Sequence, residues 1–341
     1  MTSAAARTGA TGSGPRGAGE PPAVRVGVSL GTFAAGTTGD EARAAAEYVV
    51  RAARAAAAAD LDSLTVGDHH ATGPVGYLQN APVLGRLLAE WTGRPVGCLF
   101  LVPLWHPVLL AEQVGTLATL AEAPFVLQVG MGSGAGQFAA MGVPVGERVR
   151  RTEESVRVVK ALLRGETVDS PLWGVTGARV APLPPAGVEW WVGGGVRTAV
   201  ERAARLGDAW YGNADLTLAT AKPLIDQYRE ACGRLGVVPA RIPVRKDVFI
   251  AEDASFAERV GDALVARGYR GFERGAVAYG DPHQVAEQLQ AFVALGFTDI
   301  VLRTMRPLPE EVDPGAAVAS VELAGEVRAL LRGGATPSPG G

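Results

Sequence analysis

The sequence has only two cysteines in 341 residues, Cys98 and Cys232. Cys98 lies in an apolar, strand-like run and Cys232 in a helix-like segment, so we expect core or surface thiols rather than a disulfide. Histidine is also scarce, with four in the chain. So few thiols and imidazoles provide no dense cluster of metal ligands, and we expect no metal site.

The chain also lacks a long apolar run and a block of basic residues. No stretch approaches the roughly 18 apolar residues of a membrane span, and residues 1–23 do not contain the apolar core of a secretory signal. The net charge is −3, from 32 basic and 35 acidic residues, which argues against a nucleic-acid partner. We therefore predict a cytoplasmic protein that acts on small molecules and has no membrane partner.

The two ends of the chain differ from its middle in composition. Residues 1–23 and 333–341 consist mostly of Gly, Ala, Ser, Thr and Pro, and we expect both to be disordered tails. The chain as a whole is 48% hydrophobic and 20% charged, which suits a sizeable core. Because no domain-sized linker interrupts the middle, we expect residues 24–332 to form one domain.

Eight short apolar runs alternate with helical patterns along this domain. The runs cover residues 24–30, 63–66, 96–102, 125–129, 189–192, 208–211, 244–250 and 299–302. Such alternation favours a parallel sheet covered by helices. Eight units predict an α/β fold with a single (β/α)8 barrel of TIM type, and the Pro- and Gly-containing residues 166–187 suggest an insertion after the fourth strand. A doubly wound open sheet is the alternative.

The tripeptide Asp68-His69-His70 directly follows the second apolar run. In parallel α/β proteins ligands bind at the carboxyl ends of strands, so these side chains are candidates for a site there. Imidazole titrates nearest neutral pH, which suits general acid–base chemistry. The alternative is a loop histidine that only hydrogen-bonds its neighbours. For His106, which precedes the helix expected at Pro107, capping or packing is the preferred interpretation.

Glycine-rich segments follow the fourth and fifth runs. Gly130 and Gly132 leave the backbone bare, so that a planar ligand can approach closely. A flexible loop is the alternative there.

In the second segment, Gly193, Gly194 and Gly195 precede Arg197 and Thr198 at the start of a helix. Free backbone amides beside an arginine predict a phosphate site, and a tight turn with Arg197 in solvent is the alternative.

Arg245, Lys246 and Arg303 lie on the last two runs, where barrels often bind phosphate, although salt bridges would explain them equally well. The tryptophans beside the runs are expected mostly to pack in the core or at the barrel mouth, and stacking of one of them on a ligand is the alternative.

These motifs, in this order, resemble the luciferase-like superfamily of flavin-dependent oxidoreductases. The matching segments are 66–70, 103–107, 111–113, 125–132, 142–143, 148–154, 162–165, 191–194 and 203–210. The resemblance implies a TIM-type barrel with an insertion after strand four, a homodimer, and reduced FMN or a deazaflavin at the carboxyl mouth.

The resemblance also assigns roles to residues. It implies that His69 lies near the cofactor ring as the catalytic residue, with Asp68 orienting it and His70 as a second candidate. Gly193, Gly194 and Gly195 would then hold the cofactor phosphate. A cis peptide is also implied near Leu101 to Pro103.

The leading function is a monooxygenase that takes reduced FMN from a separate reductase and acts on a small organic substrate. No second dinucleotide-binding unit is visible, which fits a two-component system. A deazaflavin-dependent dehydrogenase or reductase is the alternative. The luciferase branch commonly has Glu before its histidine pair and deazaflavin users often have Asp-His followed by an aromatic residue, so Asp68-His69-His70 is intermediate.

Two other classes of protein, phosphoesterases and non-catalytic flavin-binding proteins, are alternatives to these oxidoreductases. Asp68-His69-His70 superficially matches phosphoesterases named for that tripeptide, with Asp60 and Asp62 as further carboxylates. Those two precede the second run, however, where a barrel places them away from the mouth. A non-catalytic flavin-binding protein is the last alternative.

Overall fold

The structure is a computed structural model that describes residues 23–34, 36, 38–73, 75–306 and 315–333. The tails expected at 1–23 and 333–341 therefore lie almost wholly outside the described residues.

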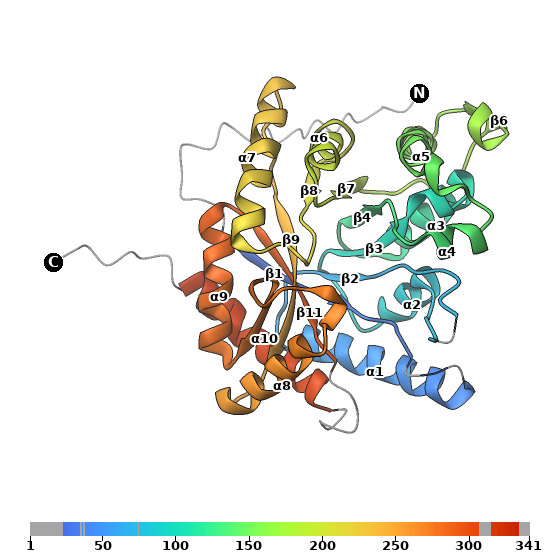
Figure 1. The fold of residues 1–341 in the computed structure, drawn as a ribbon. Coiled ribbons are helices and arrows are strands. Elements are labelled where there is room, and N and C mark those ends of the chain that lie inside the picture. Colours follow the sequence, from blue (N-terminus) through green and yellow to red (C-terminus); the bar gives the residue numbers. More distant parts are fainter. Residues whose placement is uncertain (1–22, 35, 37, 74, 307–314, 334–341) are drawn as a thin grey trace, which may run out of the picture.

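Nine parallel strands form one curled sheet, which lies inside a surrounding layer of helices (Figure 1). The strands are β1 (Arg25–Leu30), β2 (Leu64–Val66), β3 (Val96–Leu101), β4 (Phe125–Gly130), β7 (Val188–Gly193), β8 (Ala209–Tyr211), β9 (Pro243–Ile250), β10 (Val277–Gly280) and β11 (Asp299–Thr304). Their spatial order is β10-β9-β11-β1-β2-β3-β4-β7-β8. The eight runs predicted from the sequence all form strands of this sheet, and β10 is the strand that the sequence did not predict.

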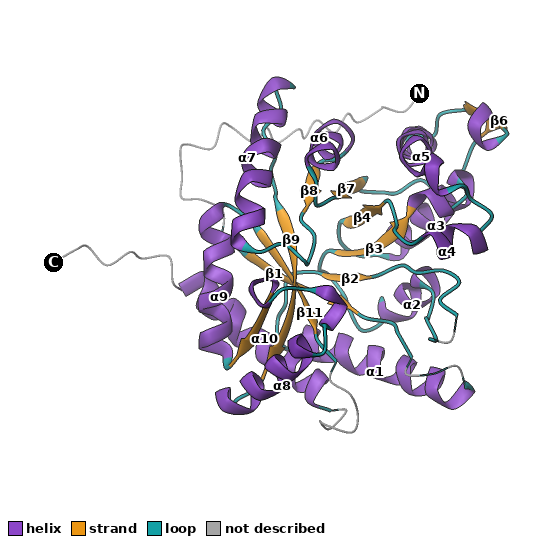
Figure 2. Cartoon of the chain, in the orientation of Figure 1, coloured by secondary structure: helices purple, strands orange, loops and turns teal. Residues whose placement is uncertain are grey.

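Helices follow most of the strands and cover the outer face of the sheet (Figure 2). They are α1 (Gly39–Ala58), α2 (Asn80–Leu87), α3 (Pro107–Leu120), α4 (Ala135–Ala140), α5 (Arg148–Leu163), α6 (Arg197–Leu206), α7 (Leu218–Arg234), α8 (Ala254–Ala266), α9 (Pro282–Leu295) and α10 (Ala316–Gly333). None of these helices has both the length and the apolar character needed to cross a membrane, as far as the chain is described.

The central strands are apolar because both of their faces are covered. Every residue of β2 is buried, and so are the last five residues of β1. α1 shows how a helix packs on this sheet. It begins with a capping box between Thr38 and Glu41, and its alanines allow close packing over much of its length.

The two ends of the strand order meet on β9. Gly212, just after β8, forms an isolated parallel bridge with Val244 of β9. The Gly212 N–H donates to the Pro243 carbonyl at 2.8 Å, and its carbonyl accepts from the Arg245 N–H at 3.1 Å. Further along the same strand, β10 pairs with β9 from Asp247 to Ile250. The sheet is therefore curled far enough for the segment after β8, at one end of the strand order, to reach β9 near the other end.

The segment expected as an insertion contains a small antiparallel hairpin of β5 (Val168–Ser170) and β6 (Val175–Ala178). The implied cis peptide near Leu101 to Pro103 is wrong, because Val102 to Leu104 form a 3-10 turn with trans bonds. In the described residues the cis bond is Ala181–Pro182.

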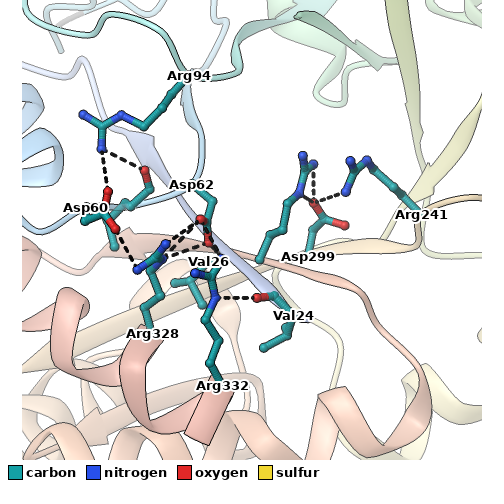
Figure 3. Close-up of polar contacts among 11 residues, drawn as sticks. Val24, Val26, Asp60, Asp62, Arg94, Arg241, Asp299, Arg328 and Arg332 are labelled. Atoms are coloured by element: carbon teal, nitrogen blue, oxygen red, sulfur yellow. Dashed lines mark hydrogen bonds and ion pairs between the residues drawn. The ribbon is translucent and has the colours of Figure 1, made fainter. Parts of the chain in front are cut away.

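An ionic cluster joins α10 to the amino ends of the strands (Figure 3). The Asp62 carboxylate accepts the Val26 N–H at 2.7 Å and hydrogen bonds from Arg328 and Arg332, the shortest to each being 3.0 and 2.8 Å. Arg328 also pairs with Asp60 at 3.0 Å. These two carboxylates thus lie at the end of the sheet opposite to the predicted mouth, which removes them from the phosphoesterase interpretation.

We predict that Asp62→Ala lowers the free energy of unfolding by about 2 kcal/mol, because it leaves the Val26 N–H without its acceptor and removes one of the partners of Arg328 and of Arg332. Chemical denaturation measures this change. Asp226→Ala is the matched control, since Asp226 is 52% exposed and pairs only with Lys222 in the same helix. The control should change stability by less than about 0.5 kcal/mol. Equal losses in both variants would contradict the proposed role of the cluster.

Candidate functional site

The carboxyl ends of the strands surround a cleft of about 450 Å³. Residues that follow β2, β4, β7 and β8 line it, together with side chains of β9 and β11. Of the residues predicted from the sequence, the cleft brings together Asp68, His69 and all five candidate glycines: Gly130, Gly132, Gly193, Gly194 and Gly195. This cleft is the candidate active site.

Asp68 ties the end of β2 to the segment after β3. It is 1% exposed. Its Oδ2 accepts the Leu101 N–H at 2.7 Å and the Trp105 indole N–H at 2.8 Å. The other carboxylate oxygen, Oδ1, has no partner among the described residues. The carboxylate therefore fixes the start of the loop that carries the histidines.

His69 packs against two aromatic rings at the wall of the cleft, and these rings also contact each other, with centroids 4.7 Å apart. The ring centroids of Phe33 and Tyr77 lie 5.5 and 5.3 Å from that of His69. Burial, aided by the nearby guanidinium groups of Arg303 and Arg270, lowers the pKa of His69 below 6.5. The imidazole is therefore mainly neutral at pH 7 and can accept a proton.

His70 points away from the cleft and is not among its lining residues. Its backbone N–H donates to Gln137 Oε1 at 2.9 Å, and its ring packs edge-on against Trp105. Its Nε2 lies 3.3 Å from Asp68 Oδ2, within ion-pair distance but without hydrogen-bond alignment. His70 thus supports the loop, while His69 faces the cavity. His106, at the start of α3, packs against Trp173 and makes no side-chain cap.

The loop from β7 to α6 presents bare backbone to the far end of the cleft. A Cβ on Gly194 would lie 2.4 Å from Ala199 Cβ, and a Cβ on Gly195 would lie 2.7 Å from Asn213 Nδ2. The Trp210 indole donates to the Gly194 carbonyl at 2.7 Å. Val196 provides no side-chain cap for α6, so the first amides of this helix remain available to an anion.

Arg197 and Thr198 contribute differently from the glycines. Both are exposed and neither lines the cleft. The Arg197 guanidinium pairs with Glu201 at 3.2 Å, one turn along α6. Their side chains therefore lie on the helix surface, and only their position in the first turn of α6 places their backbone near the glycine loop.

Two polar side chains on the floor of the cleft have unpaired atoms. Among the described residues, Gln128 Nε2 of β4 and Tyr211 Oη of β8 are buried without a hydrogen-bond partner. Burial raises the pKa of Tyr211 to about 12, so the phenol keeps its proton. Buried polar atoms are normally paired, which suggests that a polar ligand completes them.

A cluster of charged side chains lies at the other end of the cleft, on β9, β11 and the short 3-10 turn Tyr269–Gly271. Buried Asp247 accepts from Arg245 at 3.1 Å, from the Tyr269 hydroxyl at 2.9 Å and from Arg270 at 3.1 Å. Although burial opposes ionisation, Arg245, Arg303 and Arg270 hold the pKa of Asp247 below its ordinary value. Arg303 also lines the cleft.

The sequence predicted Arg245 and Arg303 as phosphate or salt-bridge residues but missed Asp247, Tyr269 and Arg270. The sequence did contain a signal for Asp247. It lies two residues after Arg245 on a buried strand, so the two charged side chains must share one face of the sheet. Lys246, between them, points to the other face. Its Nζ donates to the Leu216 carbonyl at 2.6 Å, beneath the loop that follows β8.

Comparison with known proteins agrees with this architecture. An alignment with an uncharacterized protein of Mycobacterium bovis is 27% identical over 175 residues and covers 50% of this chain and 59% of that protein. The F420-dependent glucose-6-phosphate dehydrogenase of Beutenbergia cavernae is 27% identical over 292 residues, 73% of this chain and 84% of the relative. The FMNH2-dependent dimethylsulfone monooxygenase of Pseudomonas fluorescens is 26% identical over 266 residues, with coverages of 67% and 72%.

Among solved structures, the oxygenating constituent of 3,6-diketocamphane monooxygenase from Pseudomonas putida, in complex with FMN, shares the fold. It has a TM-score of 0.75 at 18% identity and covers 90% of this chain and 98% of its own. The luciferase-like monooxygenase family model matches residues 24–274, which include every strand from β1 to β9. The chain therefore belongs to the luciferase-like monooxygenase family.

Proposed function

We propose that this chain is an oxidoreductase that binds reduced FMN in the cleft and oxygenates a small organic substrate beside His69. The fold we infer for it is a (β/α)8 barrel, with β10 as an added strand and the β5–β6 hairpin as the insertion after β4. The observation that carries the proposal is the cleft, which has bare glycine backbone at one end and a neutral imidazole at the other.

The residues of the cleft fit a flavin or a deazaflavin. The amides of the glycine loop and of the first turn of α6 would hold its phosphate, since helix N-termini favour anions. Gln128 and Tyr211 have unpaired buried atoms that a polar ring system would satisfy. Gly130 and Gly132 leave room for a planar ring to approach the backbone.

When bound, the cofactor supplies the electrons, and the protein supplies position, exclusion of water and proton transfer. His69 is the residue placed for proton transfer, because it lines the cleft and its imidazole is neutral at pH 7. Asp68 acts through the backbone, by fixing the loop on which His69 stands. Phe33 and Tyr77 pack against the His69 ring and limit its movement.

A deazaflavin-dependent dehydrogenase is the second candidate. The acidic residue before His69 is Asp68, and the F420-dependent relative from Beutenbergia cavernae aligns over 84% of its length. In that case His69 would accept the proton of a substrate hydroxyl while the hydride leaves for the cofactor.

The test is an anaerobic titration of the protein with reduced FMN and, separately, with the reduced deazaflavin coenzyme F420, followed by absorbance and fluorescence. Preferential binding of FMN, with oxygen consumption when air is admitted, supports the monooxygenase. Preferential binding of F420 supports the dehydrogenase. Failure of both to bind at micromolar concentration would contradict the proposed function.

We predict that Gly194→Val weakens binding of the preferred cofactor at least about tenfold, because the new side chain must displace Ala199 and distort the glycine loop. The same titration measures the change. Gly85→Ala is the control, since Gly85 is exposed within α2 and a Cβ there meets nothing within 4 Å. Unchanged affinity in Gly194→Val would exclude the glycine loop as the phosphate site.

A further inference from the structure

A second cavity of about 350 Å³ opens beside the cleft, at the ends of β1 and β11. We call it the side pocket, and its lining includes Ser29, Phe33, His69, Arg270, Arg303 and Arg306. Ser29, His69, Arg270 and Arg303 line the cleft as well. A molecule in the side pocket and a cofactor in the cleft would therefore meet at His69.

Arg303 is a guanidinium group without an acceptor at the junction of the two cavities. It has five N–H donors, yet no described residue accepts a hydrogen bond from it or forms an ion pair with it, and Asp247 acts on it only through charge at longer range. Its Cζ lies 5.9 Å from the centroid of the Phe33 ring, and its Nη2 lies beside Gly31, where an added Cβ would come within 3.1 Å of it. Burial lowers the pKa of Arg303 from its ordinary value. A half-buried cation in this state is costly unless an anion pairs with it.

The neighbouring residues do not provide that anion. Both oxygens of Asp247 are already engaged, Oδ1 with Arg245 and Oδ2 with Tyr269 and Arg270. Three guanidinium groups thus face one carboxylate, which leaves an excess of positive charge. No acidic residue is present among the described residues that line the side pocket. Arg306 uses one of its nitrogens on the Phe33 carbonyl, at 2.8 Å.

We propose that the side pocket binds an anionic group of the organic substrate, a carboxylate, sulfonate or phosphate, on Arg303. Arg270, which also lines the pocket, supports it, and the remainder of the substrate extends toward His69. The inference rests on the proposed function, because the substrate in the side pocket would react with the cofactor proposed to bind in the cleft. A cofactor phosphate has the same chemistry, so the experiment must separate the two sources.

The test is isothermal titration of the cofactor-loaded protein with butanesulfonate, butyrate and inorganic phosphate, and with 1-butanol as the neutral counterpart. We expect at least one anion to bind more tightly than 1-butanol. Its affinity should fall about 10- to 100-fold in Arg303→Gln, which removes a charge-assisted pair, and less in Arg303→Lys. Arg164→Gln is the matched control, because Arg164 is exposed at the end of α5 and pairs with Glu166.

Three outcomes would overturn the inference: no preference for any anion, equal anion affinity in Arg303→Gln and the parent protein, or displacement of the bound cofactor by the anion. If Arg303→Gln does not fold, an anion affinity unchanged in Arg303→Lys has the same meaning. If neither FMN nor F420 binds, the proposed function fails by itself. Anion binding that depends on Arg303 in the unloaded protein would then still support the pocket.

Discussion

His69→Ala is expected to lower turnover by about 10²- to 10⁴-fold, the range for loss of a positioned general acid–base group. Cofactor affinity should change by no more than about threefold, because the proposed phosphate contacts are made by the glycine loop and not by His69. Steady-state kinetics and the anaerobic titration measure the two quantities on the same preparation. His283→Ala is the control, since His283 is exposed on α9, outside both cavities.

The pH profile distinguishes proton transfer from a merely structural role of His69. Because the folded-state pKa of His69 is below 6.5, the neutral form dominates above that pH and is lost as the pH falls through the lowered pKa. If the neutral imidazole is the active form, kcat/KM should therefore decline on the acid side with a midpoint below 6.5. Persistence of the same acid limb in the residual activity of His69→Ala would contradict this assignment.

Asp68→Ala is expected to lower the free energy of unfolding by about 3–5 kcal/mol. The substitution leaves the Leu101 N–H and the Trp105 indole N–H buried without an acceptor. It also removes the carboxylate next to His70. Denaturant-induced unfolding, followed by tryptophan fluorescence and circular dichroism, measures the loss.

Asp68→Asn separates the hydrogen bonds from the charge. The amide oxygen can still accept from Leu101 and Trp105, so the loss of stability should be smaller than in Asp68→Ala. Turnover should nevertheless fall in both variants if Asp68 positions His69. Equal stability of Asp68→Ala and the parent protein would mean that the carboxylate does not hold the loop together.

Most of the fold could be predicted because each strand of a doubly covered parallel sheet is a continuous apolar run. The runs at 96–102 and 125–129 are of this kind, and they became β3 and β4. β10 could not be recognised in the same way. It has only four residues, and a short 3-10 turn precedes it while α9 begins two residues after it. β2 and β8 are shorter still, so length alone does not explain the omission; β10 also lacks the long apolar run of β3 and β4.

The missed part of the site follows from that missed strand. Pairing of β10 with β9 aligns Val277 with Asp247, so the segment just before β10 is brought close to Asp247. Tyr269 and Arg270 belong to this segment and reach Asp247 only because of that pairing. By contrast, His69 and Gly194 lie within three residues of the ends of predicted strands. Predicting those strands was therefore enough to place both residues at the carboxyl edge of the sheet.

Arg197 shows a different limit of sequence reasoning. A helix start is visible in the sequence, but the direction of each side chain depends on where the helix lies relative to the cleft. Glu201, one turn later, gives Arg197 a partner on the outer surface of α6. The backbone at the start of α6 therefore lies near the glycine loop, whereas the Arg197 side chain lies on the outer surface of the helix.

The junction between β8 and β9 has a mechanical consequence. β3 and β4 are joined along six residue pairs, whereas β8 and β9 are joined through Gly212 and two backbone hydrogen bonds. Local opening requires the least free energy where fewest such bonds must break. The sheet should therefore open most easily between β8 and β9, below the Asn213 to Asp215 loop. Such thermal opening would widen the glycine-loop end of the cleft before it displaced His69.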